Sequence, residues 1–399
     1  EAPLMPIEIV SEPQTFVEAV RRQQGDVFEV VGNHIGGVHF PTLLPMDPAQ
    51  PYYMVTGYAT VHSVVMNQSA FFQNHAYNMD LLMGQGQIAG LNPPHHRELR
   101  TLFFQAFNRQ SVDVLQLSAI QPLMQGLIEQ MAGKDRVDLV EAFTCNVPTY
   151  LMCEIFALPP DRCNEFAGLV SDLMNFGASW DKAMAASARL EALFLGLIEQ
   201  RKREPGDDLI SHMLVEEVEG RRLTDTEMMS FCRALVPAGV ETTTRALSTL
   251  FSAVLGAPGV WAKLGADRSL IPNAVDEAMR WNNPAQMIPK RTTVEIELVG
   301  TLLPANANLL IYLGHANRDP RRWDEPHVYK PERERKPHLA FSMGAHMCIG
   351  NQLARREMLD ALSLMLDRFP KLRLDPDRPA PRIVGIQHRS ADRIDVCLQ

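Results

Sequence analysis

The chain has 399 residues, of which 46% are hydrophobic and 21% are charged, so it is long and apolar enough to bury a large core. Its formal net charge of -9 and pI near 5.8 argue against nucleic-acid binding, because basic residues are not in excess. The chain lacks an apolar run of about eighteen residues, and its cysteines lack disulfide or zinc spacing, so we expect a cytoplasmic protein with reduced thiols and no membrane contact.

Helical spacing of apolar residues dominates the chain, and alternating segments are few. The stretches YYMVTG at 52–57 and VEIELVG at 294–300 predict strands. No repeat, low-complexity tract or long linker divides the sequence. We therefore predict one domain over residues 1–399, mainly α with small β-sheets (α+β).

A capping box, TDTE at 224–227, predicts the start of a long helix that ends before LGAPG at 255–259. Its middle contains Pro237, Gly239 and three threonines from Thr242, all poor helix formers. One interpretation is a surface helix that tolerates weak residues. The other is a local opening, in which threonine hydroxyls bond back to carbonyls one turn earlier and leave room for water or a ligand.

The stretch FSMGAHMCIG, at 341–350, places Cys348 between Gly344 and Gly350, at the start of a helix whose apolar spacing extends to Pro370. The simpler interpretation of a lone cysteine is a small buried hydrophobe. At a helix start, however, free N–H groups and the helix dipole favour a thiolate and lower its pKa. The glycines leave room for a flat ligand, and a flat ligand with one axial thiolate is haem iron.

The full pattern Phe341-x-x-Gly344-x-His346-x-Cys348-x-Gly350 resembles the haem-ligand loop of the cytochrome P-450 superfamily, in its soluble bacterial form. The resemblance implies the cytochrome P-450 fold, with haem b (iron protoporphyrin IX) between the long central helix and the helix that follows the cysteine loop. Cys348 would be the iron ligand, and the other residues of the pattern would be cofactor-binding.

The central helix also resembles the superfamily. Ala238-Gly239-x-Glu241-Thr242 is similar to its oxygen-activation segment. This implies that Ala238 and Gly239 lie against the cofactor, and that Glu241 and Thr242 are catalytic because they bring protons to bound oxygen.

Other motifs follow in the order of the superfamily. His96 and Arg100 resemble the His-x-x-x-Arg that reaches the haem propionates. Where many relatives place a further propionate arginine, this chain has Lys290 and Arg291, and either could serve. The remaining motif resembles the structural ion pair of the superfamily and its third member: Glu277, Arg280 and Arg333.

The resemblance implies a monooxygenase that inserts one atom of O2 into a medium-sized lipophilic substrate, such as a terpenoid, steroid, aromatic compound or polyketide. Electrons would come from a separate ferredoxin with a flavin reductase, and we expect a monomer. Basic residues on the cysteine side could steer an acidic donor or could be an ordinary solvated surface: Arg97, Lys330, Arg333, Arg335, Lys336, Arg355 and Arg356.

The implied substrate pocket is apolar and partly pliable. Gln387 and His388 could each orient a substrate by one hydrogen bond. Two other functions remain open: a haem-thiolate gas sensor or binding protein without turnover, and a cysteine nucleophile paired with His346. The predicted pocket residues are Tyr77, Met79, Leu82, Met83, Met174, Leu235, Met287 and Ile386.

Overall fold

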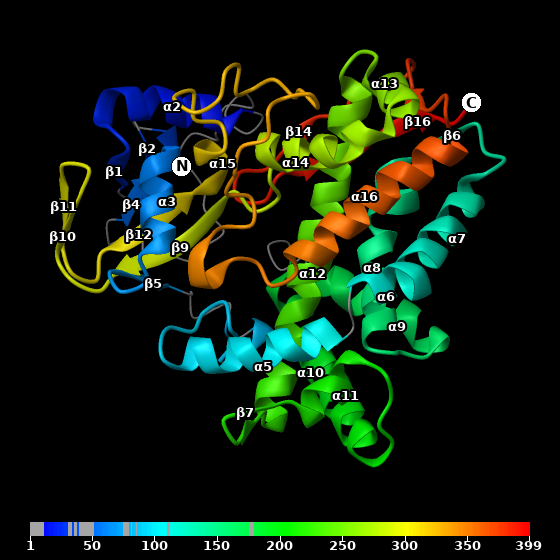
Figure 1. Ribbon diagram of the computed structural model, residues 1–399, viewed down its shortest axis with the longest axis horizontal. Helices are drawn as coiled ribbons and strands as arrows, with labels where there is room; N and C mark the ends of the chain where they lie inside the picture. The colour runs from blue at the N-terminus through cyan, green and yellow to red at the C-terminus, as the bar shows by residue number, and fades with distance from the viewer. Residues whose placement is uncertain are drawn as a thin grey trace.

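Helices make up most of the structure, a computed structural model that describes residues 12–30, 34–35, 38–39, 52–74, 80, 82–84, 86–109, 112–174 and 179–399. A small sheet lies on one side of the molecule and most helices on the other (Figure 1). The prediction of a mainly α fold with small sheets is confirmed. The helices are α2 (Pro13–Gln24), α3 (Tyr58–Met66), α5 (His95–Arg109), α6 (Val112–Leu115), η1 (Gln116–Ile120), α7 (Gln121–Met131), η2 (Val140–Thr144), α8 (Asn146–Ile155), α9 (Pro160–Met174), α10 (Trp180–Arg203), α11 (Leu209–Val215), α12 (Asp225–Gly256), α13 (Val260–Ala266), η3 (Arg268–Leu270), α14 (Ile271–Trp281), α15 (Leu313–Ala316), η4 (Gly344–His346) and α16 (Asn351–Arg368).

The largest sheet has the strand order β1-β4-β12-β9-β5, with β12 parallel to β4 and the other neighbours antiparallel. One face packs against α3 and the other against α2, because successive side chains point to opposite faces. The predicted strands correspond to β4 and β10. The strands are β1 (Val27–Val30), β2 (His34–Ile35), β3 (Val38–His39), β4 (Tyr52–Val55), β5 (Phe71–Gln73), β6 (Arg136–Asp138), β7 (Glu217–Val218), β8 (Arg221–Arg222), β9 (Met287–Thr292), β10 (Ile296–Leu298), β11 (Thr301–Leu303), β12 (Asn308–Tyr312), β13 (Arg373–Leu374), β14 (Ile383–Val384), β15 (Ser390–Ala391) and β16 (Asp395–Cys397).

The long helix α12 begins with the predicted capping box. The Thr224 hydroxyl accepts from the Glu227 N–H at 3.2 Å, and the Glu227 carboxylate accepts from the Thr224 N–H at 2.9 Å. The helix continues through Pro237 and packs against α8, α10, α14 and α16. Most of its side chains are buried, so the interpretation as a surface helix is wrong. The predicted back-bond is present, since Thr242 Oγ1 donates to the carbonyl of Ala238 at 2.6 Å.

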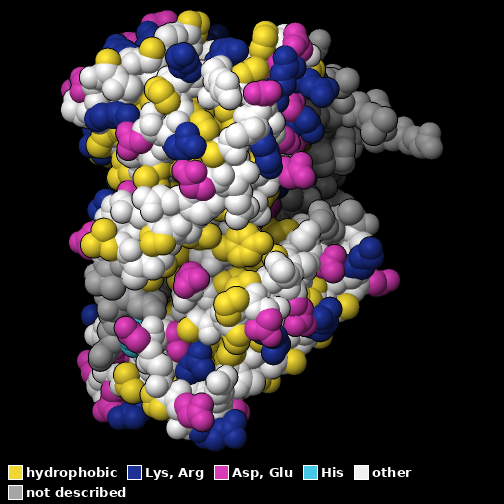
Figure 2. All heavy atoms as spheres, turned by 90° about the vertical axis from the view of Figure 1, so that its right-hand side faces the viewer, with side chains coloured by type: hydrophobic (Ala, Val, Ile, Leu, Met, Phe, Trp, Pro, Cys, Tyr) yellow, Lys and Arg dark blue, Asp and Glu magenta, His cyan; other side chains and the backbone are white. Residues whose placement is uncertain are grey.

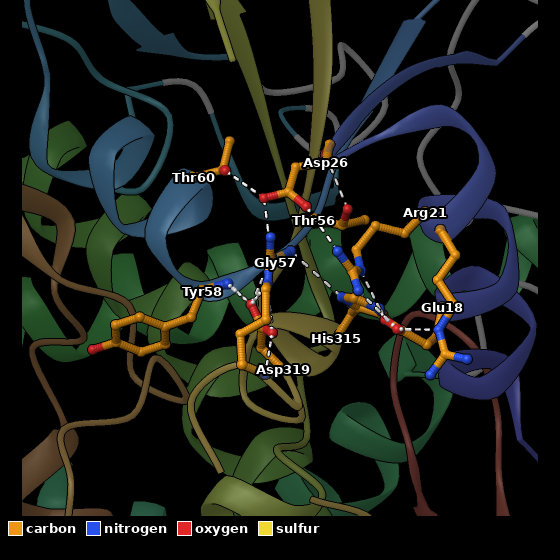
Figure 3. Close-up of polar contacts among 11 residues, drawn as sticks. Glu18, Arg21, Asp26, Thr56, Gly57, Tyr58, Thr60, His315 and Asp319 are labelled. Atoms are coloured by element: carbon orange, nitrogen blue, oxygen red, sulfur yellow. Dashed lines mark hydrogen bonds and ion pairs between the residues drawn. The ribbon is translucent and has the colours of Figure 1, made fainter.

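A buried polar network ties the N-terminal helix α2 to the rest of the fold (Figure 3). Glu18 accepts hydrogen bonds from Arg21 at 2.8 Å and from His315 Nε2 on α15 at 3.0 Å. The Gly57 N–H donates to His315 Nδ1 at 3.4 Å, which leaves the ring proton on Nε2, facing Glu18. Arg21 also donates to Asp26 at 3.2 Å. The network therefore joins α2, β1 and α15, elements distant in sequence.

We expect Glu18→Gln to destabilise the protein near neutral pH. Burial alone would raise the pKa of Glu18, but hydrogen bonds from Arg21, His315 and Arg22 outweigh it and hold that pKa far below its usual range. A carboxyl group of this kind stabilises the fold above its unfolded pKa, and the contribution disappears as the pH falls toward the folded pKa. The loss should be about 1–3 kcal/mol at pH 7 and should shrink below about pH 4, as measured by urea unfolding at several pH values. Glu29→Gln, on the exposed side of β1, is the control, and an equal loss there would contradict the assignment.

Acidic and basic side chains are interspersed on the face shown in Figure 2, with apolar side chains near its centre. No region of that face is dominated by one sign of charge. Within the described residues, no single helix has the length and apolar character to cross a membrane. The pair α12 and α13 meets those criteria only when counted together across a 98° bend.

Candidate active site

The cysteine loop is folded against α3 before α16 begins. The Cys348 N–H donates to the Phe341 carbonyl at 2.9 Å, and the Met347 N–H donates to the Gly344 carbonyl at 3.1 Å. Gly344 has φ +71°, and a Cβ there would lie 2.8 Å from the Val65 carbonyl oxygen. Only glycine fits this position without strain. A Cβ at Gly350 would meet no protein atom within 4 Å, so that side of the loop is open.

The Cys348 thiol is exposed to solvent, yet the protein surrounds it closely enough that burial raises its pKa. The two observations agree if the sulfur faces an internal space and not the outer surface. The Gly350 N–H and the charge of Arg100 both lower the pKa, in the predicted direction, but burial outweighs them. The prediction of a lowered thiol pKa is therefore wrong for the protein alone. A metal ion bound to the sulfur would remove its proton.

Basic groups gather beside this thiol. The His96 ring is buried and stacks on His346, with centroids 3.7 Å apart. Burial, followed by the charges of Arg100 and Lys290, lowers the pKa of His96 to about 4. Burial also lowers the pKa of Lys290 to about 8, and its ammonium donates to the Phe71 carbonyl at 3.4 Å. The Nε2 atom of His96 has no hydrogen-bond partner among the described residues.

The composition of this cluster suits it to bind an anion. Burial lowers the pKa values of His96, Lys290 and Arg100, and the charges of Arg100 and Lys290 lower that of His96 further. Among the described residues, the negative group that acts on Arg100 is Cys348 and not a carboxylate. Buried basic groups without an anionic partner are costly. Two haem propionates would supply that charge and accept the available hydrogen bonds. The residues present therefore fit a haem whose iron is held by Cys348.

The two predicted basic residues of β9 have different surroundings. Lys290 is 2% exposed and lies near enough to His96 to lower its pKa. Arg291 is exposed and lines a separate polar cavity with Gln73 and Asn92. Alternation along a strand separates neighbouring side chains in this way. Lys290 thus shares the basic cluster and Arg291 does not.

The middle of α12 is partly exposed. Ala238 is exposed although most of the helix is buried, and Thr242 lies one turn further on the same face. Gly239 has a different surrounding, because a Cβ there would lie 2.8 Å from Met152 Cε. Its missing side chain permits the close approach of α8.

Glu241 is held by two basic residues. Its Oε1 accepts from Arg245 Nη2 at 2.9 Å and lies 3.0 Å from His388 Nδ1. Burial would raise the pKa of Glu241, but the contacts with His388 and Arg245 outweigh it and lower that pKa. Sequence reasoning missed both partners of the carboxylate. The i,i+4 spacing could have identified Arg245, whereas no local signal links His388, which was assigned to the substrate, with α12.

The structural ion pair residues form one buried group. Glu277 accepts from Arg280 Nε at 2.7 Å and from Arg333 Nε at 2.9 Å. The Lys330 backbone N–H donates to the same carboxylate at 3.1 Å. Arg280 also donates to the carbonyls of Asn317 and Pro326. The group therefore fastens α14 to the segment that precedes the cysteine loop.

The predicted pocket residues do not lie together. Tyr77 and Met79 lie outside the described residues. One large hydrophobic cluster includes Leu82 and Leu235, and Met83 and Met174 pack against it.

Two other predicted pocket residues, Met287 and Ile386, belong to a cluster between the main sheet and α2. Met287 is three positions from Lys290 on β9, so the two side chains point to opposite faces of the sheet. This cluster is therefore on the face away from the basic cluster.

Most residues of the predicted basic surface have acidic partners. Asp276 alone contacts both Arg335 and Arg355. The remaining pairs are Lys330–Glu325, Arg333–Glu277, Lys336–Glu334 and Arg356–Asp113. Much of the positive charge is thus neutralised locally.

Comparisons with known proteins agree with this geometry. The family model described as cytochrome P450 matches residues 39–385. The chain is 33% identical over 307 residues to the cytochrome P450 monooxygenase PikC of Streptomyces venezuelae, covering 74% of this chain and 73% of that protein. It is 30% identical over 288 residues to 6-deoxyerythronolide B hydroxylase of Saccharopolyspora erythraea, covering 72% and 71%. Among solved structures, P450BioI in complex with an acyl carrier protein ligated to hexadec-9Z-enoic acid has a TM-score of 0.85 and 26% identity, covering 98% of this chain and all of that one.

Proposed function

Because the chain belongs to the cytochrome P450 family of monooxygenases, we propose that it inserts one atom of O2 into a medium-sized lipophilic substrate. The observation that carries the proposal is the Cys348 thiol beside the buried basic cluster of His96, Arg100 and Lys290. A thiol next to a set of basic groups that lack an anion matches the iron and the propionates of a haem. We propose a single haem domain over residues 1–399.

We assign haem b as the cofactor. Cys348 would bind its iron, and His96, Arg100, Lys290 and His346 would hold its propionates. Bound there, haem supplies the activation of O2, favoured by electron donation from the thiolate. The residues of the chain would exclude water, orient the substrate and deliver protons.

Thr242 and Glu241 are assigned to proton delivery. The Thr242 hydroxyl donates to the Ala238 carbonyl. Its oxygen can still accept a hydrogen bond from a water molecule beside α12. Glu241, next in the chain, carries a carboxylate that can exchange protons with such a water.

We expect Thr242→Ala to retain haem and substrate binding but to divert reducing equivalents to hydrogen peroxide. The rate of product formation should fall about 10²-fold, within the range for loss of a proton-transfer group, while NADH oxidation continues. The measurement is product and peroxide formed per NADH consumed with surrogate redox proteins. Thr244→Ala, on the opposite side of α12, is the control. Unchanged coupling in Thr242→Ala would remove the role of this hydroxyl.

The substrate class rests on the apolar character of the predicted pocket residues and on the relatives. Leu82, Met83, Met174 and Leu235 belong to an apolar region, and one relative is named as a hydroxylase of 6-deoxyerythronolide B. A solved neighbour binds a fatty acyl chain on its carrier protein. A macrolide-sized or acyl lipophile is therefore the substrate class to screen first, with terpenoids and steroids next.

The electron donor is proposed to be a ferredoxin with a flavin reductase. A solvent-open cavity of about 340 Å³ lies on the outer side of the cysteine loop, with Arg335, Lys336 and Arg355 in its lining. Because two of these cations share Asp276, recognition should depend on shape and hydrogen bonds more than on net charge.

The test is the spectrum of the purified protein, reduced and treated with carbon monoxide. A thiolate-ligated haem predicts the shifted absorption band that gives the superfamily its name, and a cysteine nucleophile predicts no chromophore. A haem-thiolate gas sensor would give the band but no product. Incorporation of one ¹⁸O atom from ¹⁸O2 into a lipophile separates the enzyme from the sensor, and its failure with an electron-accepting holoprotein would refute the proposal.

A further inference from the structure

We propose that His388 passes protons from solvent to Glu241, and so sustains the supply of protons to Thr242. The inference rests on the proposed function, because it gives the Glu241 carboxylate a source of protons. It assigns to His388 a positioning and proton-supplying role that no motif in the sequence predicts.

The first argument is the contact. His388 Nδ1 lies 3.0 Å from Glu241 Oε1, the same oxygen that accepts from Arg245 Nη2 at 2.9 Å. The His388 side chain is 25% exposed and the Glu241 side chain 15% exposed. The histidine is thus the more solvent-accessible member of a pair whose carboxylate lies on α12 beside Thr242.

The second argument is that the turn carrying His388 is rigidly built. Gly385 has φ +97°, and a Cβ there would lie 2.0 Å from the His388 carbonyl oxygen, so the turn closes only around glycine. His388 forms an isolated β-bridge with Ala285. On either side of it, the Gln286 N–H donates to the Gln387 carbonyl at 2.7 Å and the Arg389 N–H to the Pro284 carbonyl. The imidazole is therefore held at a fixed place against α12.

The third argument is the need for a proton-exchanging group. The contacts with His388 and Arg245 hold the pKa of Glu241 below its usual value, which makes the Glu241 carboxylate alone a poor proton store. Histidine is the side chain that gains and loses protons near neutral pH. In the proposed step, imidazolium gives its Nδ1 proton to Glu241 Oε1 as the N–H bond breaks and the O–H bond forms. The neutral ring is then reprotonated from solvent, and no electron is transferred.

Other charged groups surround the pair. Arg389 donates to the Gly385 carbonyl at 2.7 Å and to Asn282 Oδ1 at 3.2 Å. Asp138 of β6 and Glu141 of η2 raise the pKa of the Cys145 thiol, and Arg245 lowers it. Arg245 also contacts Ser390 of β15. None of these groups is changed in the variants described below. Their electrostatic effect on His388 and Glu241 is therefore the same in the unaltered protein and in each variant. The charged groups are Arg245, Arg389, Asp138 and Glu141.

The decisive variant is His388→Asn. The asparagine amide can place a donor near the position of Nδ1 and keep Glu241 oriented, but it cannot exchange protons. We expect unchanged haem content and thermal stability, product formation about 10²-fold slower, and more peroxide per NADH. The pH dependence of coupling should disappear. His212→Asn is the control, because His212, on α11, also lies 2.9 Å from a carboxylate, that of Asp207.

A second readout does not depend on turnover. The stretching frequency of carbon monoxide in the reduced protein reports the charge near the bound gas. We expect it to change between pH 5 and 9 in the unaltered protein and in His212→Asn, and to stay constant in His388→Asn and Glu241→Gln. His388→Phe, which removes the hydrogen bond as well, serves if His388→Asn fails to fold.

The outcomes separate the two proposals. If Glu241→Gln impairs coupling while His388→Asn retains normal coupling and the pH-dependent frequency, the inference on His388 is refuted and the role of Glu241 stands. If His388→Asn loses activity but keeps the pH-dependent frequency and coupling, its role is structural and the inference is again refuted. If Glu241→Gln and Thr242→Ala are both fully coupled, the proposed proton path through α12 fails.

Discussion

Replacing Glu277 with alanine is expected to cost about 3–5 kcal/mol of folding stability, the range for breaking a buried ion pair. Arg280 and Arg333 are 3% and 11% exposed at the side chain, and both donate to this one carboxylate. Removing it leaves two buried positive charges without an anion. A typical domain has only about 5–15 kcal/mol of total stability. Most of the protein should therefore lose its fold at moderate temperature.

The measurement is the free energy of unfolding in urea, at equal haem loading, or the thermal inactivation rate if unfolding is irreversible. Glu165→Ala is the matched control, because Glu165 pairs with Arg189 at 2.6 Å on the surface. Exposed pairs contribute about 0–1 kcal/mol. Glu277→Gln keeps an acceptor oxygen and remains measurable if the alanine variant does not fold. Equal losses in Glu277→Ala and Glu165→Ala would show that this buried group does not stabilise the fold.

Local features of the fold could be predicted from the sequence because their partners lie within one helical turn. The Thr224 and Glu227 capping box depends on residues three apart. The Thr242 hydroxyl bond to the Ala238 carbonyl depends on residues four apart. In both features, the side chain can reach its partner only if the helix forms. The spacing of the residues in the sequence is therefore enough to predict the contact.

Features that depend on packing could not be predicted in the same way. The helix start did lower the pKa of Cys348 as expected, but burial by the surrounding chain raised it more. His388, one of the two partners of Glu241, comes from a C-terminal turn that is distant from α12 in the sequence. The choice between Lys290 and Arg291 required the register of β9 within the sheet, because a shift of one residue exchanges the two faces.

The basic residues near the cysteine loop act differently in the structure from what their number in the sequence suggests. The sequence has many basic residues near the cysteine loop, which left two interpretations open: electrostatic steering of an acidic donor, or an ordinary solvated surface. In space, Asp276 lies between Arg335 and Arg355. Charge that is paired at contact distance gives little field beyond a Debye length of about 8–10 Å. A count of charges along a chain therefore overestimates the field that a partner encounters.

We expect Cys348→Ser to abolish monooxygenation without abolishing every contact to the haem. Serine is nearly the same size, so the loop bonds from Cys348 to Phe341 should persist. Its hydroxyl does not ionise as readily as a thiol and is a poor electron donor to iron, so the property that favours O–O cleavage is lost. The basic cluster of His96, Arg100 and Lys290 is untouched and should still bind the propionates. Bound haem should remain detectable while the shifted carbon monoxide band disappears and product falls below detection.

A complementary variant tests the binding of the propionates separately from the binding of the iron. Lys290→Met removes a buried ammonium, whose pKa burial lowers to about 8, and leaves the thiol in place. It should weaken haem retention, measured by transfer of haem to an acceptor protein, yet keep the shifted band in the fraction that stays loaded. Cys163→Ser, on α9, changes another free cysteine and should alter neither property. If Cys348→Ser keeps the thiolate band, or if Cys163→Ser loses it, the iron ligand is not Cys348, because only a sulfur bonded to iron can give that spectrum.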